Sequence, residues 1–129
     1  ARPRVRYLVV MRNPEEALVS MRPFLEAHSD ELLDAWQVPR AALSFPDFAT
    51  FYAGMGKHAL APRIFGFLAA WWPLRHAPNV LCLHYNDMKR DHAGALRRIA
   101  GFLGVAPSAD AWPRILEYTS FAWMKQHSE

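Results

Sequence analysis

The stretch that decides the fold is residues 6–20, RYLVVMRNPEEALVS. Its first half is a nearly continuous apolar run rich in β-branched side chains, which is typical of a strand buried on both faces of a parallel sheet. Asn13 is a favoured helix N-cap, and Pro14 is favoured at the first helical position. The acidic pair that follows suits the positive end of a helix dipole. The sequence therefore predicts a strand over residues 5–11, a tight turn and a helix.

The same order of strand and helix recurs further along the chain. The run VLCLHY at residues 80–85 predicts a second strand buried on both faces, and Asn86-Asp87 is expected to cap the helix after it. Residues 28–46 are expected to be irregular or weakly helical, and Gly54 and Gly56 to form a flexible loop. Further helices are predicted over residues 45–51, 60–75, 93–103, 110–118 and 121–126.

This alternation predicts an α/β fold. Only two strands are predicted, and both have the apolar character of strands covered on two sides. A two-stranded parallel sheet is not expected to be stable alone. We therefore expect an incomplete sheet, whose neighbouring strands lie outside this sequence or on a partner.

Composition narrows the class of protein. The chain has 129 residues, 52% of them hydrophobic and 21% charged, which indicates a packed domain or part of one and disfavours disorder. The net charge of +3 suits an anionic ligand, but the basic residues are scattered, so we expect no nucleic-acid partner. Cys82 is the sole cysteine, which points to a reducing cytoplasmic setting. No signal peptide and no membrane-spanning run is predicted.

Arg12 stands at the end of the first predicted strand, just before a helix N-terminus. Open α/β sheets bind ligands at that edge, helix N-termini favour anions, and the arginine fork matches phosphate. Ser20 lies eight residues later, about two helical turns on, and can share an anion that lies along the helix. In the alternative interpretation, Arg12 pairs with Glu16 and Ser20 is solvated. The spacing leaves both open.

Three segments, taken in order, resemble cytosolic-type sulfotransferases and cover nearly the whole chain. Residues 6–20 are similar to the family's 3′-phosphate-binding segment, where a strand ends in Arg-Asn-Pro and a serine follows eight residues after the arginine. Residues 79–104 are similar to its later strand and helix, which carry a Tyr-Glu-Asp-Met-Lys turn; here Asn86 replaces the usual acid. Residues 119–126, TSFAWMKQ, resemble its Thr-Ser-Phe-x-x-Met segment.

The resemblance implies a P-loop-type parallel sheet flanked by helices, and a site for the donor 3′-phosphoadenosine 5′-phosphosulfate (PAPS). It implies that Arg12 and Ser20 bind the 3′-phosphate. The residues implied for the adenosine are Tyr85, Thr119, Ser120, Phe121 and Met124, with Ser120 the weakest candidate because its side chain can face away. The six histidines show no metal-ligand spacing, so no metal is expected. The aromatic residues at 45–52 are expected to form either an acceptor-side lid or a packed helix.

The family's Lys-Ser-Gly-Thr-Thr donor loop, its catalytic histidine and its closing Arg-Lys-Gly loop have no match in this sequence. We therefore expect residues 1–129 to be a partial sulfotransferase domain that has no catalytic residue and is inactive alone. The parent enzyme would move a sulfuryl group from PAPS to a hydroxyl or amine of a small molecule, with a homodimer as one option. Two alternatives stay open: a kinase-like P-loop fragment, and a non-catalytic binding or scaffold domain.

Overall fold

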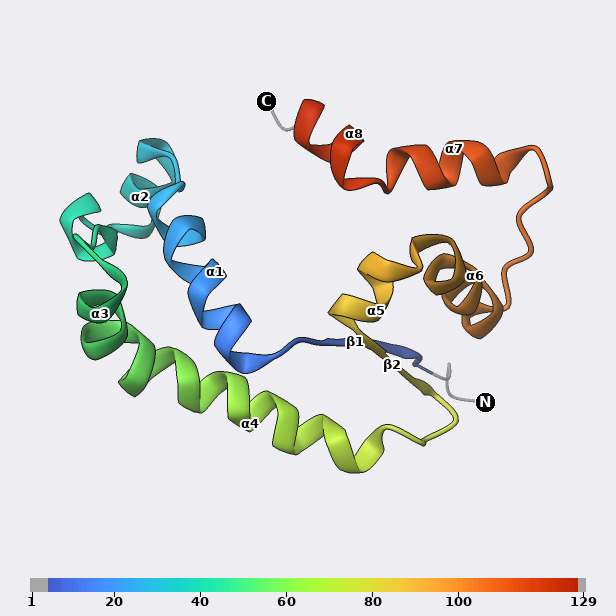
Figure 1. Cartoon of the computed structure of the whole chain (residues 1–129), viewed down its shortest axis with the longest axis horizontal. Coiled ribbons are helices and arrows are strands. Elements are labelled where there is room, and N and C mark those ends of the chain that lie inside the picture. Colours follow the sequence, from blue (N-terminus) through green and yellow to red (C-terminus); the bar gives the residue numbers. More distant parts are fainter. Residues whose placement is uncertain (1–4, 128–129) are drawn as a thin grey trace. The chain divides into compact units, whose positions relative to one another are not determined.

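The computed structural model describes residues 5–127, which fall into two compact units (Figure 1). The first unit joins the start of the chain, as far as Met11, to everything from Leu74 onward, and the second is Arg12–Pro73. Residues 1–4 and 128–129 lie outside the described residues. The prediction about a signal peptide depends partly on residues 1–4, and the predicted domain, residues 1–129, includes both ends.

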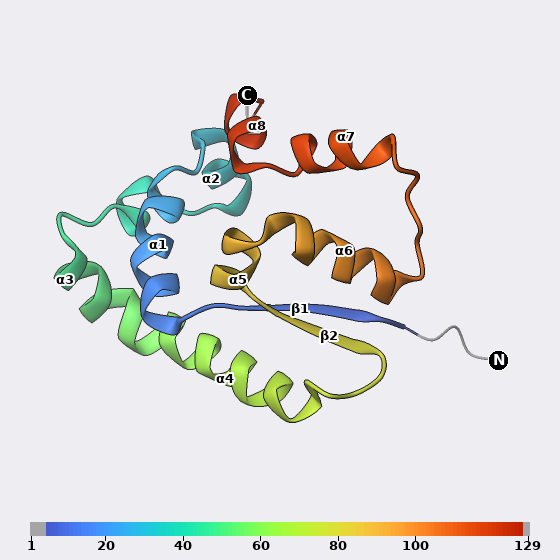
Figure 2. The ribbon, with the colours of Figure 1, turned by 45° about the vertical axis from the view of Figure 1, so that its right-hand side comes forward.

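The first unit contains a parallel sheet of two strands, β1 (Tyr7–Met11) and β2 (Val80–His84). Their register runs from Tyr7 opposite Val80 to Met11 opposite His84, and Figure 2 shows the strands side by side. Asn79 fixes where the pairing starts: its carbonyl accepts from the Tyr7 N–H at 2.8 Å, and its amide Nδ2 donates to the Val5 carbonyl at 3.1 Å. The predicted α/β class with a small parallel sheet is confirmed.

The prediction of burial on two faces is wrong for β1, whereas in β2 the residues from Val80 to Leu83 are buried or half-buried on both faces. In β1, Val9 is 3% exposed, but Leu8 and Val10 are 44% and 45% exposed. Successive side chains of a strand point to opposite faces, so one face of β1 is packed and the other is open. An apolar strand is buried on both faces only where other elements cover both faces of its sheet. In the first unit, α5 and α6 pack against β2.

Four helices follow β2 in the first unit. They are α5 (Tyr85–Arg90), α6 (His92–Leu103), α7 (Ala111–Tyr118) and α8 (Phe121–Gln126). The carboxylate of Asp91 caps α6 by accepting from the Gly94 N–H at 2.8 Å, and Gly104 ends it with φ 70°. The prediction that Asn86-Asp87 caps the next helix is wrong, because both residues lie inside α5, a helix that was not predicted. The helix starts at Tyr85, and the imidazole Nδ1 of His84 accepts from the Asn86 N–H at 3.3 Å.

The second unit is helical throughout. Its elements are α1 (Pro14–Glu26), α2 (Asp30–Trp36), the 3₁₀ turn η1 (Arg40–Leu43), α3 (Phe48–Phe51), the π-helical η2 (Tyr52–Leu60) and α4 (Ala61–Trp71); the 3₁₀ turn η3 (Trp72–Leu74) crosses the boundary of the two units. Leu18, Leu33 and Phe51 form its buried core. The predicted flexible loop at Gly54 and Gly56 is wrong, because both residues lie inside η2, which joins α3 to α4.

Packing around Phe51 explains why the helix continues through the two glycines. Phe51 is fully buried, and its ring centre lies 5.2 Å from that of Phe45 and 5.7 Å from that of Phe48. The Phe48 ring also stacks on Tyr52 at 6.1 Å. Buried aromatic surface outweighs the cost of about 0.5–1 kcal/mol for each glycine inside a helix. Within the aromatic segment 45–52 the helix begins at Phe48, and packing buries Phe51 while Phe48 and Tyr52 stay 39% and 40% exposed.

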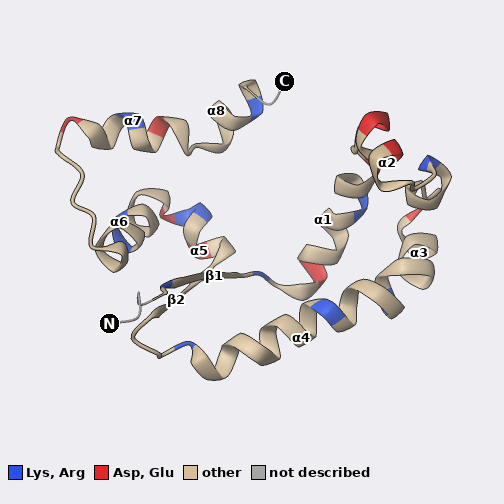
Figure 3. Cartoon of the chain, turned by 180° about the vertical axis from the view of Figure 1, so that it is seen from behind, with Lys and Arg blue, Asp and Glu red and all other residues tan. Residues whose placement is uncertain are grey.

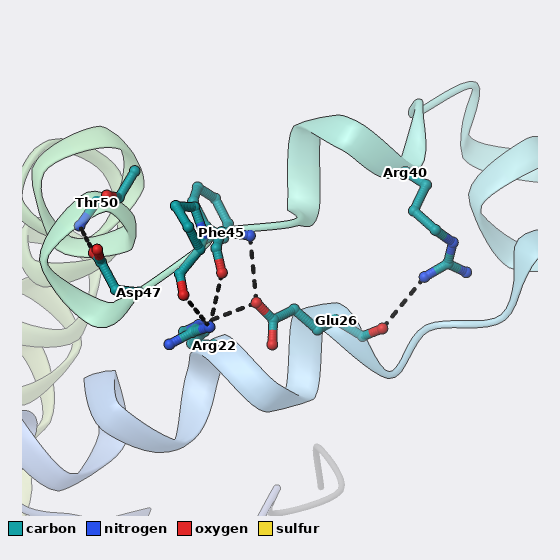
Figure 4. A network of polar contacts seen from close by, with 7 residues as sticks. Arg22, Glu26, Arg40, Phe45, Asp47 and Thr50 are labelled. Carbon is teal, nitrogen blue, oxygen red and sulfur yellow. Dashed lines mark hydrogen bonds and ion pairs between the residues drawn. The ribbon is translucent and has the colours of Figure 1, made fainter.

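A polar network fastens residues 40–46 to α1 (Figure 4). Arg22 Nε pairs with Glu26 Oε1 at 3.0 Å, and its Nη2 donates to the Phe45 carbonyl at 2.7 Å. Arg40 Nη1 donates to the Glu26 carbonyl at 3.3 Å. Next to this network, Asp47 caps α3 by accepting from the Thr50 N–H at 2.7 Å, and that bond lowers the pKa of the Asp47 carboxyl.

Candidate functional site

Arg12 and Ser20 lie together in the second unit. Arg12 directly follows β1, and Ser20 is in the second turn of α1, whose side chains lean back toward the helix N-terminus. The guanidinium Nη1 of Arg12 donates to the Ser20 hydroxyl oxygen at 2.9 Å. That hydroxyl donates in turn to the Ala17 carbonyl at 3.0 Å. The contact orients the guanidinium along the first two turns of the helix.

Glu16 is the second partner of Arg12. Its Oε2 lies 3.6 Å from Arg12 Nε, and the two side chains are 45% and 32% exposed respectively. The pairing with Glu16 that was considered from the sequence is therefore present, and Ser20 contacts Arg12 directly, a bond that was not predicted. Exposed ion pairs of this kind contribute about 0–1 kcal/mol, so turning Glu16 away from Arg12 costs little.

A shallow pocket lies beside Arg12, and its wall carries both polar and apolar side chains: Glu15, Glu16, Val19, Ser20 and Pro23. The N-terminal backbone groups of α1 contribute less here than the sequence suggested. Asn13 Oδ1 already accepts from the N–H groups of Glu15 at 2.8 Å and Glu16 at 3.4 Å. An anion in this pocket would therefore be held mainly by the Arg12 guanidinium.

The other candidate residues lie in the first unit. Tyr85 begins α5, is half-buried, and has the Lys89 ammonium 5.6 Å from its ring centre. Phe121 and Met124 lie on α8, where their side chains are 77% and 49% exposed. Other rings are exposed as well, among them Phe24 at 61%, and the Phe121 ring has enough free surface to contact a planar ligand.

Thr119 and Ser120 form the junction between α7 and α8. The Thr119 hydroxyl donates to the Ile115 carbonyl at 2.6 Å and lies 3.0 Å from His92 Nε2. The Ser120 hydroxyl accepts from the Trp123 N–H at 3.1 Å and so caps α8. Ser120 therefore has a structural use of its own. The contact with His92 was missed from the sequence, because the two residues are 27 positions apart and no spacing rule links them.

A second pocket lies at the carboxyl end of β2, where α5 meets α6. Charged and polar side chains dominate its wall, including His84, Asp87, Arg90, Asp91 and Arg98. Tyr85 is not among its lining residues.

Within residues 5–127, no group of three or more His, Cys, Asp or Glu side chains is placed to hold a metal ion. The ribbon in Figure 3 shows Lys and Arg spread over many elements.

A model of the sulfotransferase domain matches residues 1–128. The chain belongs to the sulfotransferase family. Among its relatives, sulfotransferase 2A1 of Rattus norvegicus is 31% identical over 125 residues, which are 96% of this chain and 40% of that protein. Luciferin sulfotransferase of Photinus pyralis is 27% identical over 126 residues, which are 98% of this chain and 30% of that protein. The resemblance inferred from the three sequence segments is confirmed.

A solved structure of the family has the same fold as this sulfotransferase chain. It is mouse sulfotransferase SULT7A1 complexed with PAP, with a TM-score of 0.76 and 25% identity. The match covers 96% of this chain and 41% of that one. The chain thus spans less than half the length of the sulfotransferases it is compared with. No helix among the described residues is long and apolar enough to cross a membrane.

Proposed function

We propose that this chain binds the 3′-phosphoadenosine end of PAPS as part of a sulfotransferase. The parent protein would transfer the sulfuryl group to a hydroxyl or amine of a small molecule. The observation that carries the proposal is the contact of 2.9 Å between Arg12 and Ser20, the two residues expected at the 3′-phosphate. A solved relative described as complexed with PAP supports the same class of ligand.

The chemistry of Arg12 fits a phosphate. Its guanidinium is a permanently charged, planar donor that can offer two parallel N–H groups, and charge-assisted hydrogen bonds are roughly twice as strong as neutral ones. Ser20 uses a neutral oxygen to hold the guanidinium, so it orients the charge without cancelling it. Glu16 opposes binding, because its carboxylate is attracted to the same group.

The adenosine would be held by Tyr85, Thr119, Phe121 and Met124. Stacking of a base on an aromatic side chain contributes about 1–3 kcal/mol, and the exposed Phe121 ring is suited to it. Ser120 remains the weakest member of the set, since its hydroxyl caps α8. When bound, PAPS supplies the sulfuryl group, and the residues named here bind and orient its nucleotide.

We place no catalytic residue in this chain and propose that it does not catalyse transfer by itself. The proposal treats residues 1–129 as a partial sulfotransferase domain that works without a bound metal. It also includes a cytoplasmic location and a homodimeric parent protein. A sulfotransferase assay of the chain with PAPS and a phenol or amine acceptor should give no product, and turnover by the purified chain would contradict this part.

Calorimetric titration with two nucleotides tests the binding role. The chain should bind adenosine 3′,5′-bisphosphate more tightly than adenosine 5′-monophosphate. Hydrogen bonds to charged groups contribute about 1.5–3 kcal/mol, so Arg12→Ala should weaken the bisphosphate about 10- to 100-fold and leave the monophosphate unchanged. Arg12→Lys, which keeps the charge but loses the fork, should fall between.

Arg63→Ala is the matched control, because it removes the same charge from an exposed arginine of the same unit. It should bind like the wild type. Circular dichroism confirms that each variant is folded. A folded wild type that binds both nucleotides equally would show the 3′-phosphate role to be wrong. A kinase-like ligand without a 3′-phosphate would then be favoured, and loss of all binding would favour a scaffold domain.

A further inference from the structure

We infer that His92 is a positioning residue for the adenosine side of the proposed site. It fastens the junction between α7 and α8 to the start of α6, and thereby sets where Phe121 and Met124 stand. The inference rests on the proposed function for its ligand, and on the geometry around Thr119 for the role of His92.

The hydrogen-bond directions around Thr119 define the state of His92. A hydroxyl has one hydrogen to donate, and Thr119 donates its own to the Ile115 carbonyl at 2.6 Å. The contact of 3.0 Å with His92 Nε2 therefore has the histidine as donor. Nε2 therefore carries the hydrogen of this bond.

Fixing Thr119 fixes the direction of α8. Thr119 closes α7 through its backbone N–H, which donates to the Ile115 carbonyl at 3.1 Å. The next residue, Ser120, already caps α8. Only Thr119 and Ser120 thus separate α7 from α8. Once the Thr119 side chain is held, the backbone of this junction has little freedom to change the direction of α8. Phe121 and Met124 are largely exposed and take their positions from the helix itself.

The other end of the contact leads to Tyr85. His92 is the first residue of α6, and Asp91 alone separates it from α5, the helix that Tyr85 begins. Helices α5 and α6 pack against each other and against β2. The bond between His92 and Thr119 therefore connects α5 and α6, the helix pair that carries Tyr85, to the junction between α7 and α8. That junction sets the positions of Phe121 and Met124.

The apolar side chains between α6 and α7 do not supply the same constraint. Leu96 and Ile99 of α6 and Trp112 and Ile115 of α7 line one apolar pocket, and the Arg97 guanidinium lies 5.6 Å from the Trp112 ring centre. Apolar contacts hold helices together but are non-directional. A hydrogen bond to one hydroxyl has a preferred angle and distance, so His92 can set the orientation of the junction.

Three substitutions of His92 distinguish a role as hydrogen-bond donor from a role in packing alone. His92→Gln keeps a donor where Nε2 stands, His92→Asn has a donor on a shorter side chain, and His92→Leu has none. By calorimetry, His92→Leu and His92→Asn should weaken adenosine 3′,5′-bisphosphate and adenosine 5′-monophosphate by the same factor, about 3- to 10-fold. His92→Gln should bind like the wild type.

The ratio of the two affinities is the readout that identifies a role on the adenosine side. It should stay at the wild-type value in every His92 variant, whereas Arg12→Ala should collapse it. Wild-type binding by both the Leu and the Asn variants would overturn the inference. So would a loss confined to the bisphosphate, because that would place His92 on the phosphate side.

Hydrogen exchange tests the junction without a nucleotide. In His92→Leu, the amides of Trp123 and Met124, which donate to Ser120 in the wild type, should exchange at least several-fold faster. The amide of Val105, which donates to Ala100 at the far end of α6, should not change. Unchanged exchange at residues 123 and 124 overturns the inference. A wild type without preference for the bisphosphate defeats the proposed function instead, and the exchange result still decides whether His92 holds the junction.

Discussion

At the scale of single residues, Ser20 and Glu16 both contact Arg12 and have opposite effects on an anion. Ser20 holds the guanidinium through a neutral oxygen at 2.9 Å, while the carboxylate of Glu16 lies 3.6 Å from Nε. A phosphate bound at Arg12, as proposed above, would therefore compete with Glu16 for the same positive charge. The affinity of the pocket is set by the difference between the two interactions, not by Arg12 alone.

Replacing Glu16 should accordingly improve binding. We predict that Glu16→Gln raises the affinity for adenosine 3′,5′-bisphosphate about two- to fivefold, the range expected from losing an exposed ion pair of up to about 1 kcal/mol. Affinity for adenosine 5′-monophosphate should not change. Glu15→Gln is the control: it makes the same change of charge one position away on the same helix. If both variants gained the same affinity for the bisphosphate, the effect would come from the overall negative charge near the pocket and not from the ion pair of Glu16 with Arg12.

At this scale, the positions that the sequence can predict are those for which the chain itself sets the distance. Arg12 and Ser20 are about two helical turns apart, so a helix starting at Pro14 brings them to the same side. The capping by Asn13 follows from the same local rule. The bond between His92 and Thr119 was not predictable, because 27 residues of chain separate them and only tertiary packing makes them neighbours.

At the scale of elements, local signals located the strands and the best-capped helices. The predicted bounds of α8 agree with the structure, and Gly104 ends α6 as expected. Helix α5 was missed, because its N-cap is a histidine side chain, which is not among the preferred N-caps and accepts from the Asn86 N–H. The helix through Gly54 and Gly56 was missed because burial of Phe51 overrides the weak propensity of glycine.

Two glycines of α6 should respond differently to alanine. At Gly101 an added Cβ meets open space, so Gly101→Ala should stabilise the chain by about 0.5–1 kcal/mol. At Gly94 the Cβ would collide with the carboxylate of Asp91, which caps the helix. Loss of such a cap costs about 1 kcal/mol and would cancel the gain. Urea unfolding measures both; equal stabilisation by the two variants would mean that Asp91 does not cap α6 in solution.

At the scale of the whole molecule, a large share of apolar surface remains exposed. Val9 and Val10 are adjacent in β1, yet the first is 3% exposed and the second 45%. Leu8, Phe65, Trp72 and Phe121 are also among the exposed large side chains. A chain that buries little apolar surface has little hydrophobic free energy to set against the entropy of folding.

The two valines allow a direct test, because threonine keeps the branched shape of valine and adds a hydroxyl. Val9→Thr should lower the free energy of unfolding by about 1–3 kcal/mol, since the hydroxyl loses its water. Val10→Thr should stay within about 0.5 kcal/mol of the wild type and reduce binding of a hydrophobic dye. If both variants lose stability equally, the open face of β1 is covered in solution. Repeating the measurement over a range of protein concentrations would then show whether a second copy covers it.

The direct pairing of β1 with β2 has an evolutionary consequence. All of Arg12–Pro73 lies in the chain between two strands that are hydrogen-bonded neighbours, and Asn79 fixes their register from within the first unit. The intervening segment is therefore a cassette, whose length and sequence can diverge while the strand pairing stays intact. Because Arg12 is its first residue, recombination at this border would transfer the arginine proposed to bind the 3′-phosphate together with the helix that orients it.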